Sequence, residues 1–166
     1  MTGGYFKVDS NLIFGNDQSG TIRYVVDESF NGGNPEGYAL NVTKKGIELR
    51  AASKSGLFYG EQTLRQLYTS KGIPCVSIQD NPRFPYRGLH LDVSRHFFPK
   101  EEVMKLLNVM SYYKLNTLHM HLTDAGGWRI QMDKYPKLTT DVAFRTESDW
   151  QKWCCLLYTS DAADEL

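Results

Sequence analysis

The fold is decided by the stretch YRGLHLDVSRH, residues 86–96, an apolar strand-like run that ends in charged and imidazole side chains. A second run of the same kind covers residues 115–130, and an amphipathic segment of helix length lies between the two. Pro99, followed soon by two acidic residues, marks a strong helix start. A strand, a crossover helix and a second strand predict a βαβ unit with polar groups where each strand ends. An α/β barrel begins in this way and places its chemistry there.

The residues before this unit are typical of a small α+β domain. Short alternating runs separated by turn residues predict several strands, including a hairpin of 38–43 with 46–51. The apolar spacing of 55–68 changes to a helical period, and a last strand is expected near 76–78. We therefore predict a small α+β domain over residues 1–80.

The segment NPRFP, residues 81–85, forms the domain boundary because its two prolines disfavour both a helix and a central strand. From there, we predict the first two βα units of a truncated TIM (β/α)8 barrel over 81–153. A complete barrel needs about 250 residues, of which about 70 are present here. The fold class is therefore α/β, a small α+β domain followed by an incomplete barrel. Residues 154–166 fit neither pattern and resemble translated sequencing-adapter sequence, so we predict that this tail is not native.

Composition argues against several classes of partner. The 166 residues carry 19 basic and 19 acidic side chains, and this zero net charge gives no electrostatic support for binding nucleic acid or an anionic membrane. No run approaches the roughly 20 apolar residues of a membrane span. The three cysteines, Cys75, Cys154 and Cys155, have neither a zinc-site spacing nor a disulfide pattern. No cofactor is indicated.

Arg87 and Asp92 of the first predicted strand allow two interpretations. A buried arginine and a buried aspartate often pair only to satisfy each other. Alternatively, the guanidinium of Arg87 donates to adjacent sugar hydroxyls, a geometry that suits its planar fork. The residues alone leave both interpretations open.

The second predicted strand carries the remaining candidates. His119 and His121 lie on one face of it because side chains alternate along a strand. This spacing occurs in metal sites, but no third ligand is apparent nearby. The favoured alternative is imidazoles that orient groups in a polar pocket or pack in a layer of the barrel. Asp124 follows at the end of the strand, where barrel enzymes keep their working residues. Trp128, in the next loop, is either a sugar platform or a loop anchor.

In order and spacing, these segments resemble the opening of the catalytic barrel of glycoside hydrolase family 20, the β-N-acetylhexosaminidases. The resemblance rests on residues 82–98, 108–116 and 119–130, while 37–68 resemble the small domain that precedes that barrel. It implies an enzyme that releases terminal non-reducing N-acetylhexosamine from β-N-acetylhexosaminides in oligosaccharides or glycoconjugates. The implied mechanism is retaining and substrate-assisted, with the 2-acetamido group of the sugar as the nucleophile.

The same resemblance implies roles for individual residues. Arg87 matches the arginine that grips the 3- and 4-hydroxyls of the terminal sugar, and Asp124 matches an aspartate that supports the acid/base machinery. Positions whose implied role is structural or supporting are Asp92, His96, His119, His121 and Trp128. The family's catalytic Asp-Glu pair is expected on a later strand, so no catalytic residue is assigned here. The resemblance implies no metal, and family habit favours export to the periplasm, the lysosome or the medium.

Two other functions are compatible with parts of the sequence. One is a non-catalytic carbohydrate-binding module, and the other is a metal-dependent hydrolase that uses His119 and His121. A stand-alone module is disfavoured because two isolated barrel strands would expose apolar faces and unpaired edges. For the same reason, we expect these 166 residues to be inactive and poorly soluble by themselves.

Overall fold

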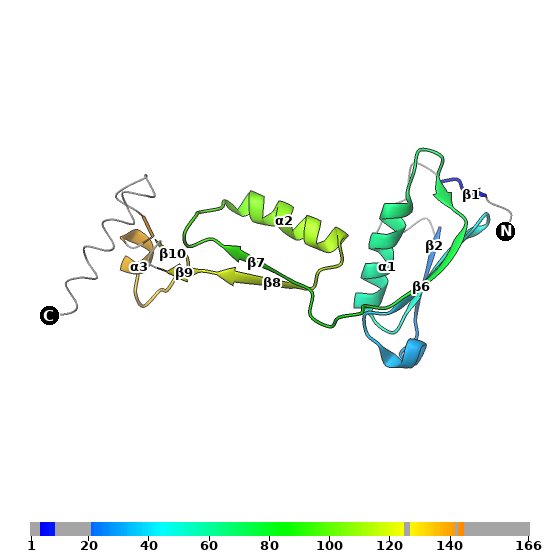
Figure 1. The fold of residues 1–166 in the computed structure, drawn as a ribbon, viewed down its shortest axis with the longest axis horizontal. Helices are drawn as coiled ribbons and strands as arrows, with labels where there is room; N and C mark the ends of the chain where they lie inside the picture. The colour runs from blue at the N-terminus through cyan, green and yellow to red at the C-terminus, as the bar shows by residue number, and fades with distance from the viewer. Residues whose placement is uncertain (1–3, 9–20, 125–126, 142, 145–166) are drawn as a thin grey trace. The chain divides into compact units, whose positions relative to one another are not determined.

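The computed structural model describes residues 4–8, 21–124, 127–141 and 143–144 (Figure 1). The tail over 154–166, predicted to be non-native, lies outside the described residues. The contacts divide the chain into two units, which we call unit 1 and unit 2. Unit 1 combines the chain up to Arg87 with Asn108–Asn116, and unit 2 combines Gly88–Leu107 with the chain from Thr117 onward.

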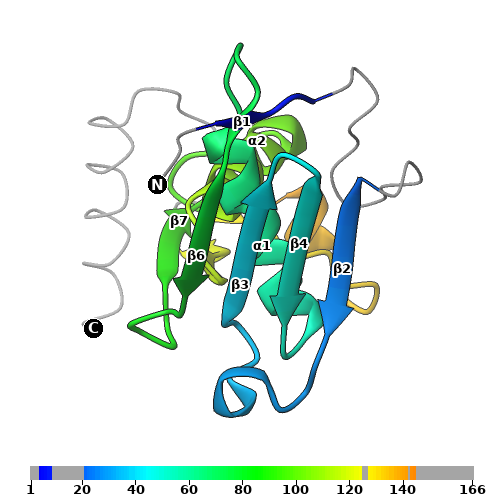
Figure 2. The same cartoon turned by 90° about the vertical axis from the view of Figure 1, so that its right-hand side faces the viewer.

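Unit 1 is built on a four-stranded sheet. Its strands, in spatial order, are β2 (Ile22–Val26), β4 (Gly46–Ala51), β3 (Tyr38–Thr43) and β6 (Val76–Asp80). Figure 2 looks onto these strands, with α1 (Lys54–Leu67) behind them. β3 pairs antiparallel with both β4 and β6, whereas β2 runs parallel to β4. The remaining elements are the antiparallel pair β1 (Tyr5–Phe6) and β5 (Ile73–Pro74), and the 3-10 helix η1 (Phe30–Gly33).

The core of unit 1 follows from the alternation of its two central strands. Leu40 and Val42 of β3, with Ile47 and Leu49 of β4, are buried in one cluster. Alternate side chains of a strand point to the same face, so these four meet Leu64 of α1, which is also fully buried. The predicted hairpin and the helix after it are therefore confirmed.

Gly56 allows α1 to approach the sheet closely. A methyl group at this position would lie 2.7 Å from Ala51 Cβ and closer still to the carbonyl oxygen of Gly37. Both neighbours are buried, so relief requires a backbone shift. We expect Gly56→Ala to lower the free energy of unfolding by about 1–3 kcal/mol in urea denaturation. Ser55→Ala, at an exposed position of the same helix, should change it by less than about 0.5 kcal/mol. Equal stability of the two variants would contradict this packing.

Unit 2 contains a parallel strand pair whose strands are connected by a helix. The elements, in chain order, are β7 (Gly88–Asp92), α2 (Lys100–Tyr112) and β8 (Thr117–His121), and α2 belongs to unit 2 as far as Leu107. Gly88 lies opposite Thr117, and Asp92 lies opposite His121. The chain continues through the antiparallel hairpin of β9 (Thr123–Asp124) and β10 (Gly127–Trp128) to the short helix α3 (Lys137–Thr140). The predicted strand–helix–strand order is confirmed, and the chain is of the α/β class.

The two faces of this strand pair differ in character. Leu91 borders a small cavity together with Val103 of α2, so this face of β7 packs against the helix. His90 and His119 lie opposite each other on the other face, and His121 shares that face because side chains alternate. The polar groups of unit 2 therefore gather away from α2.

Candidate active site

Asp92 ends β7 and organises the loop that follows it. Its Oδ1 accepts hydrogen bonds from the backbone N–H groups of Ser94 and Arg95, both at 3.0 Å. An aspartate forms such a turn where its short side chain reaches the backbone two and three residues on. The bond from the Arg95 N–H is the main cause that lowers the pKa of Asp92 to about 2, so this carboxyl is ionised at neutral pH.

Arg95 joins the carboxyl ends of the two parallel strands. Its Nη1 lies 2.6 Å from Asp92 Oδ2, and its Nη2 lies 2.7 Å from Asp124 Oδ2. The same oxygen of Asp124 lies 2.9 Å from His121 Nε2. We call these four side chains the strand-end cluster. The guanidinium lies between two carboxylates, yet the Arg95 side chain keeps 53% of its surface exposed. It can therefore still present N–H donors to a ligand.

Two further side chains fasten the loop after β7 to the β9–β10 hairpin. Ser94 is fully buried, and its hydroxyl donates to the carbonyl oxygen of Gly127 at 2.7 Å. Arg129 Nε donates to the carbonyl oxygen of Val93 at 2.9 Å. Because these bonds hold the residues just before Arg95, they restrict the position of the Arg95 backbone, from which the side chain extends.

The other residues predicted for this site lie outside the strand-end cluster. The ring of His119 packs edge-on against His90, with 4.9 Å between centroids, and that of His96 packs against Phe98 at 4.8 Å. Trp128 Nε1 donates to a carbonyl oxygen two residues along the chain at 2.5 Å, a contact that favours the loop-anchor interpretation. Across the described ranges, no group of three His, Cys, Asp or Glu side chains is placed to hold a metal ion.

Arg87 does not join the strand-end cluster. It directly precedes β7, whereas Asp124 lies beyond the end of β8, and these are opposite ends of a parallel pair. Within unit 1, its guanidinium forms a two-pronged ion pair with Glu36 at 2.9 and 3.2 Å. The side chains of this pair are 16% and 18% exposed. These contacts favour a structural role for Arg87 over the predicted sugar contact.

The two charged residues of the first predicted strand are thus partners of other groups. Of the two interpretations left open for these residues, the pairing of Arg87 with Asp92 is contradicted, because Arg87 pairs with Glu36 and Asp92 with Arg95. The expectation failed for a geometric reason. Arg87 directly precedes the five-residue strand β7, and Asp92 is its last residue. At about 3.3 Å per residue, this separates the two by more than one side chain can span.

The Glu36–Arg87 pair belongs to a larger hydrogen-bond network in unit 1. Asn116 Nδ2 and the hydroxyl of Tyr59 each donate to Glu36 Oε1 at 3.2 Å. The hydrogen bond from Arg87 is the main cause that lowers the pKa of Glu36. Asn116 Oδ1 in turn accepts the backbone N–H of Arg87 at 3.0 Å. Glu36 therefore connects the residues that directly precede β7 and β8.

A small cavity of about 190 Å3 in unit 1 is bordered by the Glu36–Arg87 pair and by a second ion pair. Lys114 Nζ donates to Asp80 Oδ2 at 3.0 Å and to the hydroxyl of Tyr38 at 2.7 Å. Burial alone would lower the pKa of Lys114, but these two hydrogen bonds outweigh it and raise that pKa. The charged side chains around the cavity are thus paired with one another, which indicates a structural cluster.

Glu36 makes the stability of the protein depend on pH in a definite direction. Its pKa is lowered from 4.5 in the folded state, so the unfolded chain binds more protons as the pH falls through this value. The stabilisation is fully present above it and is lost toward the lower folded-state pKa. We expect the wild type to lose more stability than Glu36→Gln between about pH 6 and about pH 3, measured by urea denaturation at each pH. Parallel curves would contradict this prediction.

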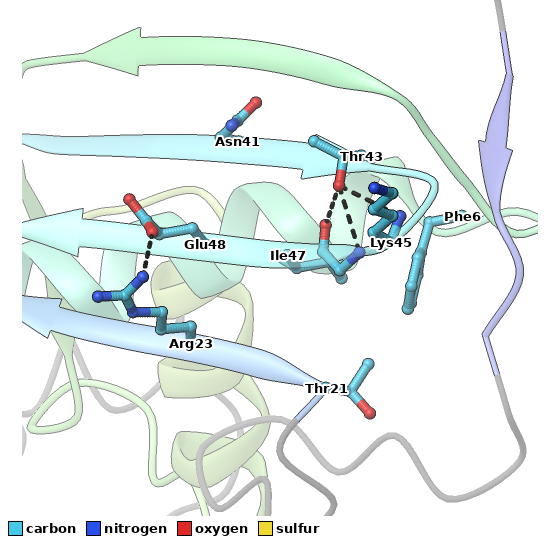
Figure 3. Close-up of a pocket in the computed structure, with 9 residues that line it drawn as sticks. Phe6, Thr21, Arg23, Asn41, Thr43, Lys45, Ile47 and Glu48 are labelled. Atoms are coloured by element: carbon cyan, nitrogen blue, oxygen red, sulfur yellow. Dashed lines mark hydrogen bonds and ion pairs between the residues drawn. The ribbon is translucent and has the colours of Figure 1, made fainter.

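A hollow of about 450 Å3 lies on the outer face of the unit 1 sheet (Figure 3). Arg23 forms an ion pair with Glu48 across it at 3.3 Å. The hydroxyl of Thr43 donates to the carbonyl oxygen of Gly46 at 3.0 Å. Because these polar groups bind each other, we assign no chemistry to this hollow.

Three residues near the strand-end cluster were missed by the sequence analysis. Arg95 had a local signal, since it follows three residues after an aspartate that can form a turn with the backbone. Ser94 and Arg129 had none, because their partners lie 33 and 36 residues away in the chain. Such contacts appear only once the strands are paired.

Comparison with known proteins covers both units. The model described as "Glycosyl hydrolase family 20, catalytic domain" matches residues 84–166, and that described as "Glycosyl hydrolase family 20, domain 2" matches residues 9–81. The Beta-hexosaminidase of Akkermansia muciniphila is 41% identical over 133 residues, which are 77% of this chain and 27% of that protein. The Beta-hexosaminidase of Porphyromonas gingivalis is 38% identical over 146 residues, 81% of this chain and 19% of that protein.

Solved structures agree with these sequence matches. The crystal structure of a GH20 exo beta-N-acetylglucosaminidase from Vibrio harveyi in complex with N-acetylglucosamine has a TM-score of 0.68 at 38% identity, covering 75% of this chain and 20% of that one. The Streptomyces plicatus N-acetyl-beta-hexosaminidase, in complex with Thio-NAglucal, has a TM-score of 0.66 at 38% identity, covering 73% and 26%. The chain thus spans about a quarter or less of these relatives. It belongs to glycosyl hydrolase family 20.

Proposed function

We propose that the complete protein is a β-N-acetylhexosaminidase, a glycoside hydrolase that releases terminal non-reducing N-acetylhexosamine from β-N-acetylhexosaminides. The observation that carries the proposal is the strand-end cluster, in which Arg95 lies between Asp92 and Asp124 at the carboxyl ends of β7 and β8. Enzymes built on α/β barrels bind substrate at that end of their strands. Membership of family 20 supports the same activity.

We propose residues 81–153 as the start of the catalytic barrel, with β7, α2 and β8 forming its first strands and crossover. Residues 1–80 would be the small domain that precedes it, and 154–166 a tail that is not native. A barrel of this kind repeats a strand followed by a helix eight times, with neighbouring strands parallel. β7 and β8 are paired in this way. The apolar and polar faces of this pair match the outside and the inside of a barrel.

Within the proposed site, Arg95 is the better candidate than Arg87 for donating to sugar hydroxyls. Arg95 is half exposed beside Asp124, whereas the guanidinium of Arg87 is largely buried against Glu36. A guanidinium fork can donate to two adjacent oxygens. Asp124 keeps its proposed supporting role, with His121 beside it. The sugar contact of Arg87 stays a prediction that these contacts do not favour.

The proposed chemistry is substrate-assisted and retaining. The 2-acetamido oxygen of the sugar attacks its own anomeric carbon, and the glycosidic bond breaks as a glutamate protonates the leaving oxygen. Water then opens the resulting oxazolinium ring at the anomeric carbon and gives its proton to the same glutamate, now the general base. An aspartate beside that glutamate would orient the acetamido group, and we place this pair on a later strand of the complete protein. The strand-end cluster would hold the sugar in place for this attack.

Substrates would be oligosaccharides or glycoconjugates with a terminal N-acetylhexosamine. One relative, from Vibrio harveyi, is named N,N'-diacetylchitobiase and is 39% identical over 123 residues, which supports a β-linked N-acetylglucosamine substrate. None of the described helices is long and apolar enough to cross a membrane. We also propose that the complete protein is exported from the cytoplasm, as is common in the family.

Hydrolysis assays on the complete protein test the proposal. We expect turnover of p-nitrophenyl N-acetyl-β-glucosaminide and much weaker turnover of p-nitrophenyl β-glucoside, which lacks the acetamido nucleophile. A chelator should leave the rate unchanged, because the proposed mechanism uses no metal. Saturable binding of an N-acetylated oligosaccharide without turnover would instead support the carbohydrate-binding module. Equal rates on the two nitrophenyl sugars would exclude substrate assistance.

A further inference from the structure

We propose that His121 is a positioning residue, which orients the carboxylate of Asp124 and thereby holds Arg95 in the direction of the bound sugar. The inference rests on the proposed function, because it assumes that the strand-end cluster contacts the substrate. His121 itself need not touch the sugar. Its effect is transmitted through one oxygen atom, Asp124 Oδ2, which lies within hydrogen-bond distance of both His121 Nε2 and Arg95 Nη2.

Pairing with β7 and the residue after it fixes the backbone of His121. It is the last residue of β8 and lies opposite Asp92. Its carbonyl oxygen accepts the N–H of Val93 at 3.1 Å, one residue past the end of β7. The imidazole therefore projects from the end of a paired strand, and Asp124 stands in the short strand β9. A donor on a paired strand beside the carboxylate that binds Arg95 is the arrangement expected of a positioning pair.

The two carboxylates that flank Arg95 are held by different means. Asp92 is fixed by two backbone N–H groups of the turn that follows it, at 3.0 Å each. Asp124 receives a side-chain bond from His121, at 2.9 Å. Removal of the imidazole should therefore take away a hydrogen bond that orients the Asp124 carboxylate, while the turn that holds Asp92 is unchanged. Arg95 would then remain paired to Asp92 but lose a defined direction for Nη2.

His119 provides a comparison with His121, because the two histidines lie on the same strand but make different contacts. It stands two residues before His121 on the same face of β8, but its ring packs against His90 at 4.9 Å between centroids. The spacing of the two histidines alone therefore does not assign their roles. The contact with Asp124 distinguishes His121 from its neighbour.

A double-mutant cycle in the complete protein tests the inference. We expect His121→Leu to lower kcat/KM by about tenfold, mainly through a higher KM, because a hydrogen bond to a charged group is lost. His121→Gln, whose amide nitrogen can reach the position of Nε2, should recover most of this loss. In an Asp124→Asn background, His121→Leu should change kcat/KM by less than about twofold, since the two residues act as one unit.

A structural role predicts different results in the same set of variants. His121→Gln would then not restore kcat/KM, and the effects of His121→Leu and Asp124→Asn on kcat/KM would be additive. Either of these two results overturns the inference. A crystal structure of His121→Leu provides a readout that does not depend on activity, because the Asp124 carboxylate should rotate and its Oδ2 should move beyond about 3.5 Å from Arg95 Nη2. A carboxylate that stays in place overturns the inference, whatever the activity of the wild type. A wild type that hydrolyses no N-acetylhexosaminide contradicts the proposed function, but it does not decide whether His121 orients Asp124.

Discussion

Replacement of Glu36 by Leu should lower the free energy of unfolding by about 3 kcal/mol. The change leaves the Arg87 guanidinium without its two-pronged partner in an environment where only 16% of its side chain is exposed. Asn116 and Tyr59 lose the acceptor of their hydrogen bonds at the same time. Urea or thermal denaturation of the complete protein measures the effect.

Two controls separate this mechanism from a general loss of charge. Glu48→Leu removes a carboxylate that pairs with Arg23 and Arg50 on the exposed face of the sheet, and surface pairs are worth about 0–1 kcal/mol. Glu36→Leu combined with Arg87→Met should be more stable than Glu36→Leu alone, because no buried charge is left unpaired. Equal destabilisation by Glu36→Leu and Glu48→Leu would show that Arg87 is not held in this way.

The elements of both units could be predicted from the sequence because their signals are local. The hairpin of β3 and β4 follows from alternation on either side of a short turn, and residue pairs from Tyr38↔Ala51 to Thr43↔Gly46 reproduce it. The strand–helix–strand order of unit 2 follows from the apolar runs and from Pro99 at the helix start. Such patterns depend on neighbours in the chain, and tertiary contacts do not reverse them here.

The candidate site was only partly predictable. Asp124 was placed at the end of its strand by sequence alone, and the structure puts it beside His121 and Arg95. The role of Arg87 could not be read in the same way, because its partner Glu36 lies 51 residues earlier. An arginine beside a strand has no local feature that distinguishes a sugar contact from a structural ion pair.

Replacement of Arg95 by Leu should lower kcat/KM for a nitrophenyl N-acetylhexosaminide by about a hundredfold or more. Truncation of a charged group that is hydrogen-bonded to its partner costs about 2–5 kcal/mol, and each 1.36 kcal/mol corresponds to about tenfold in rate. The loss should appear largely in KM if Arg95 binds the sugar equally in the ground state and the transition state. Steady-state kinetics of the complete protein measure it, with Arg83→Leu, at an exposed arginine between β6 and β7, as the matched control.

Substitution of Arg87 tests whether Arg95 or Arg87 contacts the sugar. Arg87→Leu should lower the melting temperature, because it leaves Glu36 buried and without its cationic partner, while the KM of the protein that remains folded stays near that of the wild type. Arg95→Leu should show the reverse, since its side chain is half exposed and exposed pairs contribute little to stability. A large rise in KM for Arg87→Leu with an unchanged melting temperature would return the sugar contact to Arg87. It would also remove the reason for placing the substrate at the strand-end cluster.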